Sequence, residues 1–189
     1  VRKFRKSDAK TPIVLMGSYN PIHAYGTARF CKDAAEAGID GFLIVDLPPE
    51  EDEVLRVPAN LHGLDVVRFV TPTSDAARRK TILDGASGYL YYVSMAGITG
   101  TKAISADEAQ AAFAELRKTT ALPCTVGFGI RTPEQAHGVA RFADGVVVGT
   151  AIVSKIFENL NAKAKRAALV SNVAEFCKAL ADSVHAARP

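Results

Sequence analysis

Phe42-Leu43-Ile44-Val45 is an unbroken apolar run, and Val146-Val147-Val148 is a second. Strands with one solvated face alternate apolar and polar residues, whereas parallel strands that are covered on both faces are apolar throughout. Further runs of the same kind occur, and the six predicted strands are 12–18, 41–46, 66–71, 88–94, 124–129 and 145–150. Their starts lie about 27 residues apart on average, close to the length of a strand-helix-strand unit. The sequence therefore predicts an α/β fold built from repeated βα units.

Helix boundary signals lie between the predicted strands. Thr132-Pro133-Glu134-Gln135 fits a capping box with proline at the first helical position, residues 105–108 fit a second box, and Gly38 fits a helix stop. A closed barrel of this repeat, the TIM (β/α)8 barrel, uses eight strands and typically about 250 residues. We therefore expect residues 1–189 to form a single TIM-barrel domain to which this chain supplies about six βα units, its first two βα units preceding Val1.

Composition excludes several classes of protein. The 189 residues are 48% hydrophobic, and 23 Lys and Arg against 20 Asp and Glu leave a net charge of +3. This balance predicts a globular protein without a nucleic-acid or membrane partner. No apolar run has the length of a membrane-spanning helix, and we expect a cytoplasmic protein. The three cysteines are widely spaced and suggest buried free thiols, with no metal site.

The predicted functional site lies at the carboxyl ends of the strands, where barrel enzymes carry their chemistry. Gly129 and Gly149 follow the last two strands, and a helix opening at Thr150 would direct unpaired amides and its positive dipole end toward an anion. We interpret this pattern as a phosphate cradle. For either glycine cluster alone, a tight turn that needs a positive φ is the favoured interpretation, and only the two together favour phosphate binding.

Other strand ends offer weaker candidates. Residues 94–102 are small and glycine-punctuated, as in loops that close over a substrate, although an ordinary loop has the same composition. Tyr91 should point to the inside of the barrel and Tyr92 to the outside. Asp46 stands at the mouth, where its simplest role is to bind loop amides. The acidic run 50–53 follows two prolines and should fill the first turn of a helix, so it is assigned no chemistry.

Five motifs together carry a resemblance to a known family. They occur in order as Met16-Gly17-Ser18-Tyr19-Asn20-Pro21-Ile22, Val45-Asp46-Leu47-Pro48-Pro49-Glu50-Glu51, Tyr91-Tyr92-Val93-Ser94-Met95-Ala96-Gly97-Ile98-Thr99-Gly100, Val126-Gly127-Phe128-Gly129-Ile130 and Asp144-Gly145-Val146-Val147-Val148-Gly149-Thr150-Ala151-Ile152-Val153. In this combination the chain resembles the tryptophan synthase α subunit, from the third strand of that barrel to its last helix.

The resemblance implies a lyase of tryptophan biosynthesis that cleaves indole-3-glycerol phosphate to indole and glyceraldehyde 3-phosphate by a retro-aldol reaction. It also implies a β-subunit partner in an α2β2 heterotetramer, with pyridoxal phosphate in the β partner and no cofactor in this subunit. Matching positions imply substrate binding by Leu43, Val45, Tyr91, Thr99, Gly100, Phe128, Gly129, Gly149 and Thr150. They imply a partner interface at Asn20, Pro21 and Pro48.

Departures from the family pattern bear on activity. Ser18 stands where the family commonly has tyrosine, and Thr150 where it commonly has serine. The catalytic Glu and Asp of the family fall before Val1, so the resemblance implies that this polypeptide alone is nearly inactive. Two alternatives stay open: another sugar-phosphate-binding barrel isomerase or epimerase, and a non-catalytic module that activates a β subunit.

Overall fold

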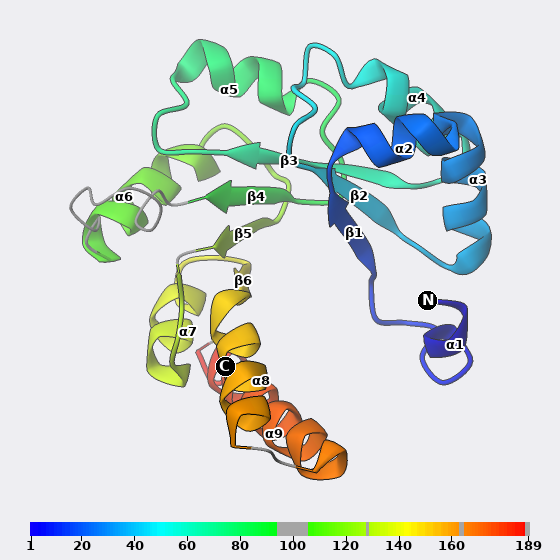
Figure 1. The fold of residues 1–189 in the computed structure, drawn as a ribbon. Helices are drawn as coiled ribbons and strands as arrows, with labels where there is room; N and C mark the ends of the chain where they lie inside the picture. Colours follow the sequence, from blue (N-terminus) through cyan, green and yellow to red (C-terminus); the bar gives the residue numbers. More distant parts are fainter. Residues whose placement is uncertain (94–105, 128, 163–164, 188–189) are drawn as a thin grey trace. The chain divides into compact units, whose positions relative to one another are not determined.

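The computed structural model describes residues 1–93, 106–127, 129–162 and 165–187 (Figure 1). The chain divides into two compact units, residues 1–70 with 74–90 and residues 71–73 with 91–189. Each unit is described by itself. Strand neighbours follow the chain order, β1-β2-β3 in the first unit and β4-β5-β6 in the second.

The first unit alternates helices with parallel strands. Its elements are α1 (Arg2–Arg5), β1 (Val14–Gly17), α2 (Tyr19–Tyr25), α3 (Thr27–Ala37), β2 (Gly41–Ile44), α4 (Glu53–Leu61), β3 (Asp65–Val70) and α5 (Ala76–Leu83). β2 pairs in parallel with β1 on one side and with β3 on the other. Gly38 ends α3 with a φ of +92°, in the left-handed region, as its sequence position predicts.

The core of this unit lies between the strands and helices α2, α3 and α4. Phe42 and Ile44 of β2 pack there with Cys31 of α3 and Leu55 of α4. Side chains alternate along a strand, so Leu43 takes the opposite face of β2, where it is also buried. All four residues of β2 are buried, which explains the continuous apolar run in the sequence.

A buried ion pair ties three elements of the first unit together. Asp52, the residue before α4, is 2% exposed, and Arg68 of β3 is 5% exposed. Arg68 Nε donates to Asp52 Oδ2 at 2.8 Å, and Arg68 Nη1 donates to the carbonyls of Thr81, Ile82 and Asp84 at the end of α5. Arg56 donates to the second carboxylate oxygen of Asp52 at 3.0 Å. The prediction that the acidic run 50–53 fills the first turn of a helix holds only for Glu53, because α4 begins at that residue and Asp52 precedes it as a buried ion-pair partner.

The second unit contains β4 (Leu90–Val93, which begins at the last residue of the first unit), α6 (Ala106–Arg117), β5 (Cys124–Gly127), α7 (Pro133–Ala140), β6 (Gly145–Val147), α8 (Thr150–Asn161) and α9 (Arg166–His185). β5 and β6 pair in parallel. Helix α9 packs against both α7 and α8. The Thr132 hydroxyl accepts a hydrogen bond from the amide of Gln135, and Pro133 opens α7, so this predicted helix start is confirmed. All six predicted strands are present; β3 is shifted by one residue, and the others are shorter than their apolar runs.

Candidate functional site

The late-strand glycines lie at one edge of the second unit. Parallel pairing places Gly127 of β5 beside Val147 of β6. Gly129 and Gly149 each lie two residues beyond these partners, so both follow the carboxyl ends of adjacent strands. The structure thus brings together two glycines that the sequence analysis assigned to one cradle.

The two glycines differ in conformation. Gly129 has a φ of +62°, which L side chains rarely adopt. Gly149 precedes α8 with φ −117° and ψ −77°, and a Cβ added there would meet no atom within 4 Å. The positive φ that the turn interpretation requires is therefore found at Gly129 and not at Gly149.

The start of α8 supplies the donors. The first amides of an α-helix have no carbonyl four residues earlier in the helix to accept from them, and Gly149 has no side chain to cap them. The carbonyl of Gly149 is engaged, since it accepts from the amides of Ile152 and Val153 at 3.0 and 3.2 Å. Thr150 is exposed at the first position of the helix. This end of α8 carries the positive end of the helix dipole and can hold an anion.

Tyr91 borders the same pair of strands. A Cβ placed on Gly127 would collide with the hydroxyl and ring of Tyr91, so the tyrosine lies across β5 where Gly127 has no side chain. The neighbouring Tyr92 is 2% exposed and packs edge-on against Phe113 of α6, with ring centroids 6.2 Å apart. The two tyrosines thus take opposite faces of β4, as predicted.

The remaining substrate-binding predictions divide between the first unit and undescribed residues. Leu43 is buried in β2, and Val45 just after that strand is 51% exposed. Thr99, Gly100, Phe128 and the predicted closing loop 94–102 lie outside the described residues.

The predicted partner interface gathers at the carboxyl ends of β1 and β2. Asn20 and Pro21 lie in the first turn of α2, Pro48 lies four residues after β2, and all three are exposed. Asp46 Oδ1 accepts a hydrogen bond from the amide of Tyr19 at 2.7 Å, which ties the two segments together. Binding a loop amide is the role that the sequence analysis gave as the simplest for Asp46.

No other kind of site emerges from the described ranges. They contain no group of three or more His, Cys, Asp or Glu residues that could hold a metal ion. Within the same ranges, no helix has both the length and the apolar character needed to cross a membrane. The cysteines are free; burial raises the pKa of the Cys31 thiol to about 11 and also raises that of Cys124. Both buried thiols are therefore protonated at neutral pH and unsuited to nucleophilic chemistry.

The strand order and the alternating helices define an α/β protein of the barrel type, with two late-strand glycines at one edge. A family model described as "Tryptophan synthase alpha chain" matches residues 1–185. The chain belongs to the tryptophan synthase alpha chain family, a family of lyases of tryptophan biosynthesis.

Individual relatives agree with the family model. The chain is 53% identical over 165 residues to a tryptophan synthase alpha chain from Gluconacetobacter diazotrophicus. This alignment covers 87% of this chain and 60% of the relative. A crystal structure of tryptophan synthase subunit alpha from Legionella pneumophila matches 97% of this chain and 66% of that protein, with 40% identity and a TM-score of 0.87. The chain thus spans less than two thirds of the length of these two relatives. The match to the L. pneumophila structure confirms the predicted barrel-type α/β fold.

A third comparison concerns assembly. A structure of the tryptophan synthase α2β2 complex from Pyrococcus furiosus matches 96% of this chain, with 32% identity and a TM-score of 0.80. The chain covers 71% of that protein.

Proposed function

We propose that this chain is the phosphate-binding part of a tryptophan synthase α subunit that acts on indole-3-glycerol phosphate, giving indole and glyceraldehyde 3-phosphate. The observation that carries the proposal is the register of β5 and β6, which places Gly129 and Gly149 at one edge next to the start of α8. Family membership supplies the reaction, and the glycine edge supplies a position for the phosphate. Neither the isomerase alternative nor the non-catalytic alternative is favoured by any feature of the fold.

In this proposal the described residues bind and orient the substrate. The amides of Gly149 and Thr150 hold the phosphate, and Tyr91 forms part of the wall beside it. Leu43 and Val45 contribute apolar surface to the rest of the substrate. Proton transfer is assigned to the Glu and Asp that the family carries on a segment not matched by this sequence, so this chain alone should turn over substrate very slowly.

The partner and the cofactor follow from the same proposal. Asn20, Pro21 and Pro48 form the contact with a β subunit, and the α2β2 assembly named for the P. furiosus relative supports a partner of that kind. The α subunit needs no cofactor for a retro-aldol cleavage driven by acid and base, and pyridoxal phosphate resides in the β partner.

A charge substitution tests the phosphate site without disturbing the helix. Gly149→Asp adds a carboxylate at the N-cap position, where aspartate is among the preferred residues, and the site has room for its Cβ. The variant should keep or raise the unfolding temperature while losing affinity for inorganic phosphate and indole-3-glycerol phosphate, because the carboxylate repels them and competes for the same amides. Gly149→Asn is the matched neutral control.

The readout is a titration of isotope-labelled protein followed by amide NMR. Inorganic phosphate should shift the amide signals of Gly129, Gly149 and Thr150 in the wild type and not in Gly149→Asp. If the amides of Gly149 and Thr150 do not respond in the wild type, or if the aspartate variant binds as well as the asparagine variant, the proposed phosphate site is wrong.

A further inference from the structure

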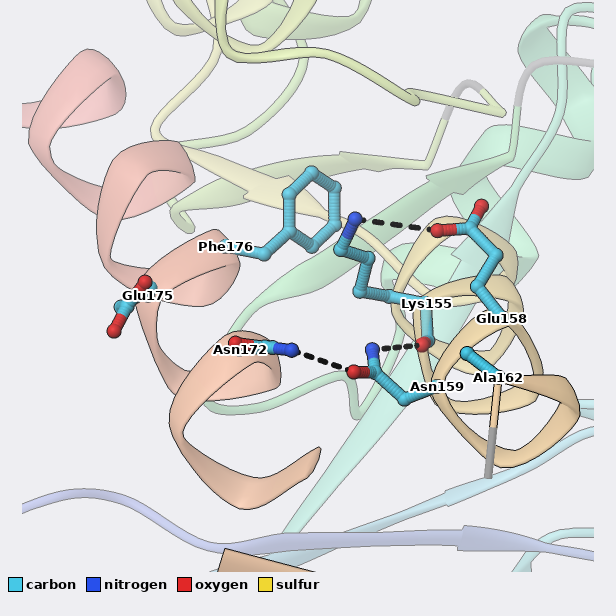
Figure 2. A pocket seen from close by; sticks show the side chains of 7 residues that line it. All are labelled: Lys155, Glu158, Asn159, Ala162, Asn172, Glu175 and Phe176. Atoms are coloured by element: carbon cyan, nitrogen blue, oxygen red, sulfur yellow. Dashed lines mark hydrogen bonds and ion pairs between the residues drawn. The ribbon is translucent and has the colours of Figure 1, made fainter. Parts of the chain in front are cut away.

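Two asparagines, Asn159 and Asn172, join α8 to α9 near the carboxyl end of α8, away from Gly149 and Thr150 at its start (Figure 2). Asn159 of α8 is 7% exposed, so its carboxamide is buried. Asn172 Nδ2 donates to Asn159 Oδ1 at 2.6 Å. Asn159 Nδ2 donates in turn to the carbonyl of Lys155, one turn earlier in α8, at 2.8 Å. The buried carboxamide is thus held on both sides.

The pair borders a shallow, solvent-open groove of about 440 Å³ that is lined by side chains of both helices. Figure 2 shows side chains from both helices around it, including Lys155 and Phe176. Lys155 is already engaged with Glu158 at 3.2 Å, and Glu175 accepts from Ser171 at 3.0 Å. Because the groove is open to solvent and lined mainly by polar side chains, the directed hydrogen bond contributes to how the helices align here.

Apolar contacts tolerate sliding, whereas a hydrogen bond to the buried Asn159 carboxamide is satisfied in one alignment alone. In coiled coils, a single buried asparagine fixes the register of the helices at a cost in stability. Leaving the Asn159 oxygen without its donor would incur the desolvation penalty of a buried polar group. The bond between Asn172 and Asn159 therefore selects one placement of α8 on α9.

We propose that Asn159 and Asn172 are positioning residues for phosphate binding, an inference that rests on the proposed function. Asn159 lies nine residues after Thr150, about 13 Å along the axis at 1.5 Å per residue. A helix moves as a nearly rigid rod over this length, so a shift at Asn159 changes the direction in which the first-turn amides point. The pair acts on the ligand through the axis of α8 and does not touch it.

The main test variant is Asn172→Ala, because Asn172 is exposed and its truncation removes the donor without opening the core. We expect its affinity for inorganic phosphate to fall by about tenfold, because the first-turn amides would no longer be held in the geometry that matches the anion. Asn172→Gln retains a carboxamide donor and should recover most of the affinity. Asn161→Ala, at an exposed asparagine at the end of α8, is the matched control and should bind phosphate like the wild type.

A double-variant cycle separates positioning from general loosening. If the two asparagines act through their shared bond, Asn159→Ala combined with Asn172→Ala should weaken phosphate binding no more than the stronger single variant. Unfolding temperatures are measured alongside, since a purely structural pair would lower them and leave the dissociation constant unchanged.

The two proposals fail in distinguishable ways. If wild-type protein shows no phosphate response at Gly149 and Thr150, the proposed function itself fails. If the wild type responds and Asn172→Ala binds phosphate with wild-type affinity, the positioning role is refuted while the phosphate site stands.

Discussion

Replacing Arg68 by methionine tests how strongly the buried ion pair stabilises the first unit. The substitution keeps an unbranched side chain of similar length and removes the guanidinium. It leaves the Asp52 carboxylate, 2% exposed, with Arg56 as its remaining basic partner. The carbonyls of Thr81, Ile82 and Asp84 also lose a common donor.

The magnitude follows from these losses. Breaking a buried pair by removing one partner costs about 3–5 kcal/mol, because the other charge stays buried. Arg56 offsets part of this cost, and the orphaned carbonyls add to it, since an unsatisfied buried group costs about 1–3 kcal/mol. We therefore expect Arg68→Met to lower the free energy of unfolding by about 4 kcal/mol, a large share of the 5–15 kcal/mol typical of natural proteins.

The assay is urea unfolding followed by far-ultraviolet circular dichroism, since the chain contains no tryptophan. Arg78→Met is the matched control. Its ion pair with Glu50 is exposed, with 42% and 48% of the two side chains accessible, so its removal should cost no more than about 1 kcal/mol. The double variant Asp52→Leu/Arg68→Met removes both charges and should regain part of the lost stability. Equal effects of Arg68→Met and Arg78→Met would refute this account of the buried pair.

Two further substitutions and one labelling experiment give separate outcomes. Gly127→Ala should displace Tyr91, which would change the NMR signals of the Tyr91 ring, and should lower the free energy of unfolding by about 1–3 kcal/mol. Unchanged Tyr91 signals would contradict the close approach of the tyrosine ring to Gly127. At pH 8, iodoacetamide should modify Cys177 well before Cys31, which is fully buried and has a pKa raised to about 11. The fold favours the protonated thiol of Cys31, so its contribution to stability is complete below pH 9 and is lost as the pH rises through 11. Early labelling of Cys31, detected by peptide mass spectrometry, would contradict this prediction. Phe157 is 60% exposed and lies between Val153 and Leu160 on an exposed apolar stripe of α8. Phe157→Ser should therefore reduce self-association, measured by sedimentation velocity, without altering the unfolding temperature. Unchanged sedimentation would show that the stripe does not mediate association.

The strands and the glycine edge could be predicted because both depend on local sequence. A buried parallel strand must be apolar throughout, and Phe42-Leu43-Ile44 is, which fixes the position of β2. Parallel strands of a sheet all end at the same edge, so Gly129 and Gly149 had to lie near each other once β5 and β6 were adjacent. The assignment of these glycines to phosphate stays a prediction.

The ion pair could not be predicted in the same way, because its members are 16 residues apart and meet only through the fold. Asp52 looked like one of several carboxylates at a helix start. The overlooked signal was Arg68, a charged residue inside the apolar run Val66-Val67-Arg68-Phe69-Val70. A buried arginine in a strand needs an anionic partner, and that requirement points back to the acidic run. The asparagine pair left no comparable signal, since asparagine on a helix is ordinarily exposed.

The use of main-chain amides at the start of α8 would determine how phosphate affinity depends on pH. Main-chain amides do not ionise in the physiological range, so a ligand held by them meets donors whose strength is the same at pH 5 and pH 8. Any variation of affinity across that range would then report the second ionisation of the phosphate ester itself, near pH 6. Recognition of this kind leaves the ligand, and not the protein, as the titrating partner.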